Sequence, residues 1–271
     1  MAAVTSAEKK SINVNAISRA IGKGLAAYLT KTLPGYQRLD TLSVADVAAV
    51  LQAGDILLVE GNTRISTAIK YLTQSSWSHA CLYTGGGAEN SDVANLLEAD
   101  LNHGVRLVSL QHYVNFNLRI CRPVGLNRED TERLIEFAKS KLGHRYDLKN
   151  VFDLIRYLIQ KPVVPNRFRR AMIGLGSGEP TKAICSTLIA ESFQFIDYPI
   201  LPRVGGAGEG VGGTASEPLQ LKRRHFTLFT PRDFDLSPYF KVVKPTIESG
   251  FDYRRLNWQQ SQRSGGGATD R

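Results

Sequence analysis

Short apolar segments separated by turn residues fill the middle of this chain, and they constrain its fold more than any other feature. Glycine and asparagine stand between them, as is typical of turns, while apolar residues dominate within them, as is typical of strands. Between residues 54 and 124 the segments read GDILLVEG, WSHACLYTG, NLLEADL, GVRLVSL and NLRICRPV. The pattern predicts a small, mostly antiparallel sheet or barrel.

Helical periodicity surrounds these segments. Residues 64–73 place their apolar side chains on one helical face, and Asn127 can cap a helix that runs to about Leu142. Further helices are expected over 148–160 and from Cys185 onward, with a last strand in 239–245. Strands followed by helices indicate the α+β class, with the sheet packed against helices.

The chain divides by composition into three parts. We expect a basic, amphipathic helical extension at 1–43, one compact domain at 44–245 and a flexible tail at 246–271. Within 1–40, apolar residues recur at helical spacing, and Glu8 is the only acid before Asp40. Such a helix can lie on an anionic membrane surface, or pack its apolar stripe on the domain. A transit peptide is a third interpretation if the source is eukaryotic.

The net charge of +9 fits nucleic acid, anionic lipid or an acidic polymer as a partner. Nucleic acid is the least favoured of these, because the basic residues are dispersed and no recognised motif interleaves them with stacking aromatic residues. No segment approaches the ~18–20 apolar residues of a membrane-spanning helix, and the N-terminus lacks the apolar stretch of a secretion signal. We therefore expect a cytoplasmic protein with peripheral membrane contact through 1–40 as an option.

Three cysteines at wide spacings argue against a disulfide framework and form no CxxC metal motif. We accordingly expect no metal and no other cofactor. Cys81 and Cys121 lie within strand-like segments, where a cysteine is usually a small buried hydrophobic residue.

Cys185 differs from them because it stands where an apolar-periodic helix begins. The unpaired N–H groups and the positive dipole end of a helix N-terminus lower the pKa of a thiol and can stabilise an oxyanion. Cys185 is therefore a candidate nucleophile, and its base must be sought upstream, since the next histidine is His225.

His79 and Glu98 are the candidate partners. Alternation places Trp77, His79 and Cys81 on one face of their strand, and it puts Glu98 in the middle of the next strand. A histidine and a carboxylate at such positions are costly in a core unless Glu98 accepts a ring N–H of His79. Alternatively, Glu98 pairs with a basic neighbour such as Arg106.

These motifs, in this order, resemble the circularly permuted papain-like enzymes of the NlpC/P60 superfamily, in particular the YiiX-like amidase/peptidase family. The matching segments are GDILLVEG, SHACLYTG, LLEAD followed by GV, GHRYD and ICSTLIAESF. In that family the strands with the histidine and the acid precede the helix with the cysteine, which reverses the order in papain. The resemblance implies that Cys185 is the nucleophile, His79 its base and Glu98 the orienting acid. It also implies that Tyr146 lines the site, where we expect Trp77 to contact substrate too.

The expected function is that of a cysteine-dependent hydrolase, which cleaves an amide bond through this triad and an acyl-enzyme. A lipid acyl hydrolase or acyltransferase of the same fold remains open, so the substrate is a peptide, another amide or a lipid acyl group. A non-catalytic module that binds peptide or lipid is the alternative from another class.

Overall fold

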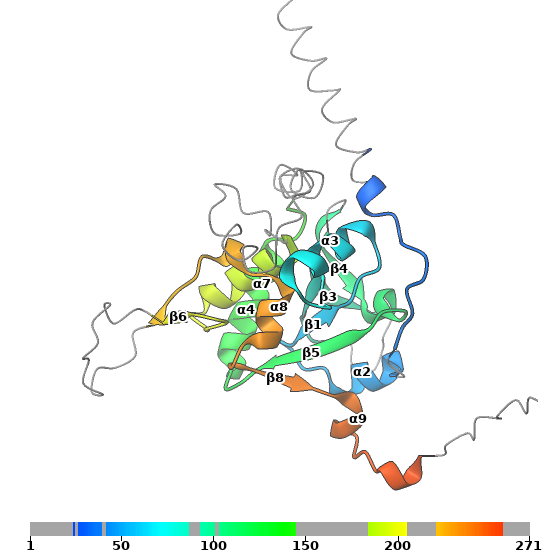
Figure 1. Cartoon of the computed structure of the whole chain (residues 1–271). Helices are drawn as coiled ribbons and strands as arrows, with labels where there is room; N and C mark the ends of the chain where they lie inside the picture. The colour runs from blue at the N-terminus through cyan, green and yellow to red at the C-terminus, as the bar shows by residue number, and fades with distance from the viewer. Residues whose placement is uncertain are drawn as a thin grey trace, which may run out of the picture.

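A six-stranded antiparallel sheet forms the centre of the protein (Figure 1). The computed structural model describes residues 24, 27–39, 42–86, 93–100, 103–144, 184–204 and 221–256. The strand order is β4-β3-β2-β1-β5-β8. The strands are β1 (Ile56–Val59), β2 (His79–Tyr83), β3 (Ala94–Asp100), β4 (Gly104–Ser109), β5 (Leu118–Pro123) and β8 (Phe240–Val243), with β6 (Arg203–Val204) and β7 (Leu221–Lys222) as a separate pair. All five strand-like segments in 54–124 are therefore strands, as predicted.

Helices surround the sheet and complete the predicted α+β class. The α-helices are α2 (Val44–Val50), α3 (Arg64–Thr73), α4 (Arg128–Ser140), α7 (Ile184–Phe195), α8 (Pro231–Leu236) and α9 (Pro245–Glu248); the 3-10 helices are η1 (Leu110–Tyr113), η2 (Phe226–Leu228) and η3 (Tyr253–Arg255). Asn127 caps α4 as expected, since its side chain accepts a hydrogen bond from the backbone N–H of Asp130 at 2.7 Å. The helix predicted over 148–160 lies outside the described residues.

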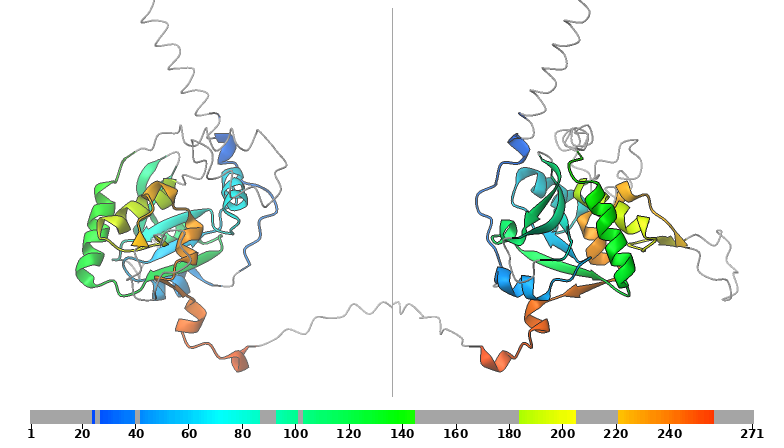
Figure 2. Two further views of the ribbon diagram at one scale, coloured as in Figure 1. Left: turned by 60° about the vertical axis from the view of Figure 1, so that its left-hand side comes forward. Right: turned by 180° about the vertical axis from the view of Figure 1, so that it is seen from behind.

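The two faces of the sheet pack against different helices. Ile56 and Leu58 of β1 join the cluster that includes residues of α4, α7 and α8. Leu57 and Val59, which alternate with them, join the cluster of α2 and η1 on the other face. Figure 2 shows the yellow α7 and the green α4 together on one side of the sheet. Because both faces are covered, all four residues of β1 are buried.

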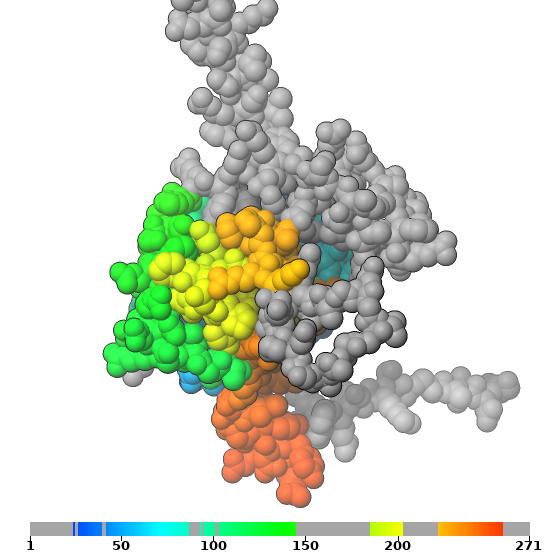
Figure 3. Space-filling model, turned by 90° about the vertical axis from the view of Figure 1, so that its left-hand side faces the viewer, coloured from blue at the N-terminus to red at the C-terminus, as the bar shows by residue number. Residues whose placement is uncertain are grey.

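The contact between α4 and α7 fixes how α7 is oriented on the sheet. The rings of Phe137 and Phe195 stack with their centroids 4.3 Å apart, and Lys141 pairs with Glu191 at 3.0 Å. Figure 3 views the molecule from this side, with α4 in green and α7 in yellow. Aromatic stacking and an ion pair along one helix contact hold the rotation of α7 about its axis. The side chains at the start of α7, including Cys185, therefore have a fixed direction.

The chain before α2 runs along the domain where it is described. Leu29 is buried in the core, Thr32 forms a β-bridge with Thr63, and the backbone N–H of Leu39 donates to the side chain of Asn117 at 2.8 Å. Most of the predicted amphipathic stripe lies outside the described residues, so membrane contact through 1–40 stays a prediction. Among the helices that are described, none is both long and apolar enough to span a bilayer.

Candidate active site

Cys185 lies in the first turn of α7, as the periodicity predicted. Its side chain is buried, and the fully buried Leu188 and Phe193 anchor the same helix against the sheet. The Cys185 sulfur lies beside the imidazole of His79 and near the backbone of Ala80 and Ser186. The thiol is thus held between the N-terminus of a helix and the start of β2, and the ring of His79 is its polar neighbour.

His79 opens β2 and pairs with Val59 of β1. Its Nε2 atom lies 2.7 Å from Oε2 of Glu98, and its side chain is 22% exposed. Since Glu98 accepts the hydrogen of Nε2, the other ring nitrogen, Nδ1, is left for the Cys185 sulfur. The two nitrogens of one imidazole therefore serve the acid and the thiol, which is the arrangement that a nucleophile–base–acid triad requires.

Glu98 is a buried carboxylate with a complete set of donors. Its Oε1 accepts a hydrogen bond from Nε of Arg106, the residue opposite it on β4, at 2.8 Å. Its Oε2 accepts from His79 and from the hydroxyl of Tyr113. Burial by itself raises the pKa of Glu98, but the bonds from His79 and Tyr113 and the charge of Arg106 outweigh it and lower this pKa to about 2. Glu98 thus binds both of the partners that the sequence suggested as alternatives, His79 and Arg106.

The pKa values of the thiol and the imidazole shift toward an ion pair. Burial opposes the Cys185 thiolate, yet His79 and the backbone N–H groups of Ala80 and Ser186 outweigh burial and lower the pKa of the thiol. Burial likewise opposes the charged imidazole, but the sulfurs of Cys81 and Cys185 beside it raise the pKa of His79 well above 6.5. The site therefore favours a thiolate beside an imidazolium, which is the reactive form of a cysteine nucleophile.

Cys81 lies within the site, although its place in a strand suggested only a small buried hydrophobic residue. Its sulfur, a ring nitrogen of His79 and a carboxylate oxygen of Glu98 lie within 4.8 Å of one another, a set of atoms that could ligate a metal ion. Both oxygens of Glu98, however, already accept hydrogen bonds from Arg106, His79 and Tyr113. A metal ion would have to displace these donors, so the group fits a hydrogen-bonded network better than a metal centre.

Trp77 packs differently from the prediction. It precedes β2, so strand alternation does not extend to it, and it joins the core cluster of Ala80 and Leu82 rather than the face of Cys81. Its indole N–H donates to Asp235 at 3.1 Å, and the side chain is 8% exposed. Its contact with substrate remains a prediction. Tyr146, the other predicted substrate contact, lies outside the described residues.

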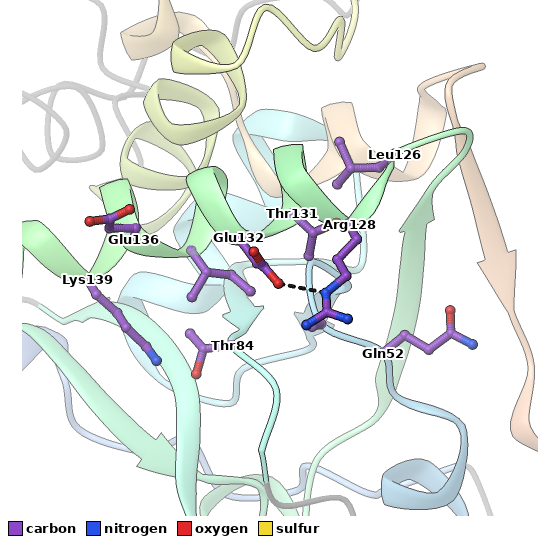
Figure 4. Close-up of a pocket in the computed structure, with 10 residues that line it drawn as sticks. Gln52, Thr84, Leu126, Arg128, Thr131, Glu132, Glu136 and Lys139 are labelled. Carbon is purple, nitrogen blue, oxygen red and sulfur yellow. Dashed lines mark hydrogen bonds and ion pairs between the residues drawn. The ribbon is translucent and has the colours of Figure 1, made fainter.

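A separate hollow of about 640 Å³ lies between α4 and the loops next to β1 and β2 (Figure 4). Gln52 and Thr84 line it from the loops, and the Arg128–Glu132 ion pair of α4 lies along it. None of the candidate triad residues lines this hollow. It is an open hollow of mixed polar and apolar lining, and we assign it no part in the chemistry.

The order of these elements is that of a permuted papain-like α+β fold, with the strands of His79 and Glu98 ahead of the helix of Cys185. Residues 50–157 match the sequence model of a family described as a permuted papain-like amidase enzyme, YaeF/YiiX, C92 family. The match confirms the resemblance to YiiX-like permuted papain-like enzymes, and it supports a cysteine-type hydrolase in general. The match includes His79 and Glu98 and ends before Cys185.

Among solved structures, the chain is similar to the metalloprotein yiiX from Escherichia coli O157:H7. The two are 18% identical with a TM-score of 0.44, and the similarity covers 71% of this chain and 96% of that one. A search of curated proteins finds no match.

Proposed function

We propose that the protein is a cysteine amidase or peptidase in which Cys185, His79 and Glu98 form the catalytic triad. One observation carries the proposal: the imidazole of His79 lies between a buried carboxylate, at 2.7 Å, and a thiol at the start of a helix. A packing role would require none of these three polar groups to be buried together. Nucleophilic catalysis requires all three.

The first half of the reaction forms an acyl-enzyme. The Cys185 thiolate attacks the carbonyl carbon of the scissile amide and forms a tetrahedral intermediate whose oxygen carries the negative charge. Backbone N–H groups at the start of α7 would donate to this oxyanion. The His79 imidazolium then protonates the leaving amine as the C–N bond breaks, which leaves a thioester on Cys185 and a neutral imidazole.

The second half restores the enzyme. Neutral His79 takes a proton from water, and the resulting hydroxide attacks the thioester. The intermediate collapses to a carboxylic acid and the Cys185 thiolate, while His79 is again an imidazolium. Throughout, Glu98 holds the Nε2–H tautomer so that Nδ1 stays directed at the sulfur. With a lipid acyl substrate the same steps would cleave an ester or amide and hand the acyl group to water or to another nucleophile.

Alkylation of the full-length protein by iodoacetamide, followed by mass spectrometry at a series of pH values, tests this proposal. The chain carries its own reference thiols, because burial raises the pKa of Cys81 and raises that of Cys121 to about 12. Cys185 is expected to react fastest near neutral pH, and His79→Ala is expected to remove that advantage, since it removes the group that lowers the pKa of the thiol.

Two results would contradict the proposal. One is that Cys185 reacts no faster than an ordinary free thiol. The other is that Cys185 reacts equally fast in wild type and in a folded His79→Ala variant. Either result would favour a binding module in which the thiol has no chemical role. If Cys185 is activated, libraries of peptide amides and acyl esters would then identify the bond that it cleaves.

A further inference from the structure

The proposed mechanism leaves one buried thiol of the site without a part. Cys81 is two residues from His79 on the same face of β2 and is completely buried. Burial raises the pKa of the Cys81 thiol, whereas the pKa of Cys185 is lowered, so Cys81 holds its proton more firmly than Cys185 does. Cys81 is therefore not a second nucleophile. It is a thiol that can donate a hydrogen bond.

That proton has a defined acceptor. The Cys81 sulfur lies 3.4 Å from the hydroxyl oxygen of Tyr113, within the range of a hydrogen bond to sulfur. Tyr113 lies in η1, is 5% exposed and makes its other hydrogen bond to Oε2 of Glu98. The same Oε2 atom receives Nε2 of His79. The four groups thus form one continuous chain from Cys81 through Tyr113 and Glu98 to His79.

The chemistry of the groups fixes the direction of each hydrogen bond. An ionised carboxylate can only accept, so the single hydroxyl proton of Tyr113 must be donated to Glu98. The oxygen of Tyr113 is then left to accept, and the Cys81 thiol is the donor that faces it. In this direction every donor is used. Without a donor at Cys81, one of the two contacts that orient the Tyr113 hydroxyl would be lost.

We infer that Tyr113 and Cys81 are positioning residues for the proposed triad: the Cys81 thiol orients the Tyr113 hydroxyl, which in turn holds Glu98 ionised and directed at His79. The inference rests on the proposed function for the meaning of the triad, but the hydrogen-bond chain can be tested separately. Arg106 binds the opposite oxygen of Glu98, so it supplies charge to the carboxylate while Tyr113 fixes the oxygen that faces the imidazole. Tyr113 contacts the carboxylate and Cys81 lies beside the imidazole, so both act through other residues of the proposed triad.

The test is to measure the pKa of Glu98 in the full-length protein by NMR of the glutamate carboxyl carbons as a function of pH. The Glu98 signal is assigned as the one that is missing in Glu98→Gln. In wild type Glu98 is expected to stay ionised to about pH 2. Tyr113→Phe removes one donor to the carboxylate together with the acceptor of the Cys81 thiol, and it should raise the pKa of Glu98 by about one unit.

Cys81 offers a conservative pair that isolates its donor. Cys81→Ser keeps a hydroxyl donor and should leave the titration of Glu98 close to that of wild type. Cys81→Ala removes the donor and should raise the pKa of Glu98 in the same direction as Tyr113→Phe, by less. Cys121→Ala is the matched control, because Cys121 is equally buried in β5 and takes part in none of these contacts. This pair also decides the question if Tyr113→Phe fails to fold.

The outcomes separate this inference from the proposed function. An unchanged Glu98 titration in Tyr113→Phe, or in Cys81→Ala if the former does not fold, overturns the positioning role. If Cys185 still alkylates fast in wild type, the hydrolase proposal survives that result. A raised Glu98 pKa in a protein whose Cys185 reacts slowly would support the hydrogen-bond chain and contradict the hydrolase. A raised pKa together with a slower reaction of Cys185 at acidic pH supports both.

Discussion

The Nε2 atom of His79 and the Oε2 atom of Glu98 are 2.7 Å apart. His79 is the first residue of β2, and Glu98 lies in the middle of the neighbouring strand β3. The Glu98 side chain is 3% exposed, so this bond lies in a region of low dielectric constant. An imidazole that is bound in this way has its tautomer and its ring direction fixed before any substrate arrives.

His79 should remain charged at pH values where a free histidine is neutral. Its pKa is raised well above 6.5 by the sulfurs of Cys81 and Cys185 beside it, so the imidazolium should persist to higher pH than that of a free histidine. In Cys185→Ala one of these sulfurs is gone, and the pKa of His79 should fall. NMR of the histidine ring nitrogens against pH measures both values. Equal pKa values of His79 in the two proteins would argue against a thiolate–imidazolium pair.

Glu98 should make the stability of the fold depend on acid pH. Its pKa is about 2 in the folded protein against 4.5 ordinarily, so its stabilisation is fully present above 4.5 and is lost as the pH falls toward 2. The difference corresponds to about 3 kcal/mol of unfolding free energy at neutral pH. Urea unfolding between these pH values should therefore show a steeper decline for wild type than for Glu98→Gln. Parallel curves would mean that Glu98 titrates alike in both states.

The Asp55–Arg122 ion pair should contribute strongly to stability. Asp55 is 1% exposed and receives two bonds from the guanidinium, from Nε at 2.8 Å and from Nη2 at 2.7 Å. Arg122→Gln leaves a buried carboxylate without its cation, and the expected loss is about 3–5 kcal/mol of unfolding free energy. Because burial already raises the pKa of Asp55, the loss should grow as the pH rises through that pKa and the buried group ionises.

An exposed pair provides the control for that experiment. Arg128 and Glu132 lie 2.8 Å apart on the surface of α4, and the Arg128 side chain is 92% exposed. Arg128→Gln should lower the unfolding free energy far less than Arg122→Gln does, because water screens an exposed ion pair. Chemical unfolding of both variants gives the comparison. If the two substitutions cost the same, burial would not be what makes the Asp55–Arg122 pair important.

Trp77 should act in packing whatever its contact with substrate. Its indole N–H donates to Asp235 at 3.1 Å, and the guanidinium of Arg119 lies 4.8 Å from the ring centroid. Trp77→Phe keeps an aromatic ring but loses the donor and some volume, so unfolding free energy should fall by about 1–2 kcal/mol. A double-mutant cycle with Asp235→Ala should show coupling between the two positions. A Trp77→Phe variant as stable as wild type would exclude this packing role.

The sequence by itself determined the strands and helices, the face of the sheet on which Glu98 lies and the position of Cys185 in its helix. Alternation of polar and apolar residues depends only on the two-residue repeat of a strand, so it placed Glu98 on the face opposite Leu97 correctly. Helical periodicity located Cys185 at the start of α7, because the spacing of the buried residues Leu188 and Phe193 is a local property. Alternation failed for Trp77, because this residue precedes β2 and is not part of the strand.

Only the tertiary structure decided which groups surround the carboxylate. Tyr113 belongs to a short 3-10 helix after β4, where no periodicity predicts the direction of a side chain. Its hydroxyl reaches Glu98 because η1 packs against β3. Cys81 was visible on the His79 face, but an isolated strand gives no reason to expect a donor role for a buried thiol. Contacts of this kind depend on strand register and on packing between elements distant in sequence. Local sequence patterns do not encode these distances, and the assembled sheet sets them.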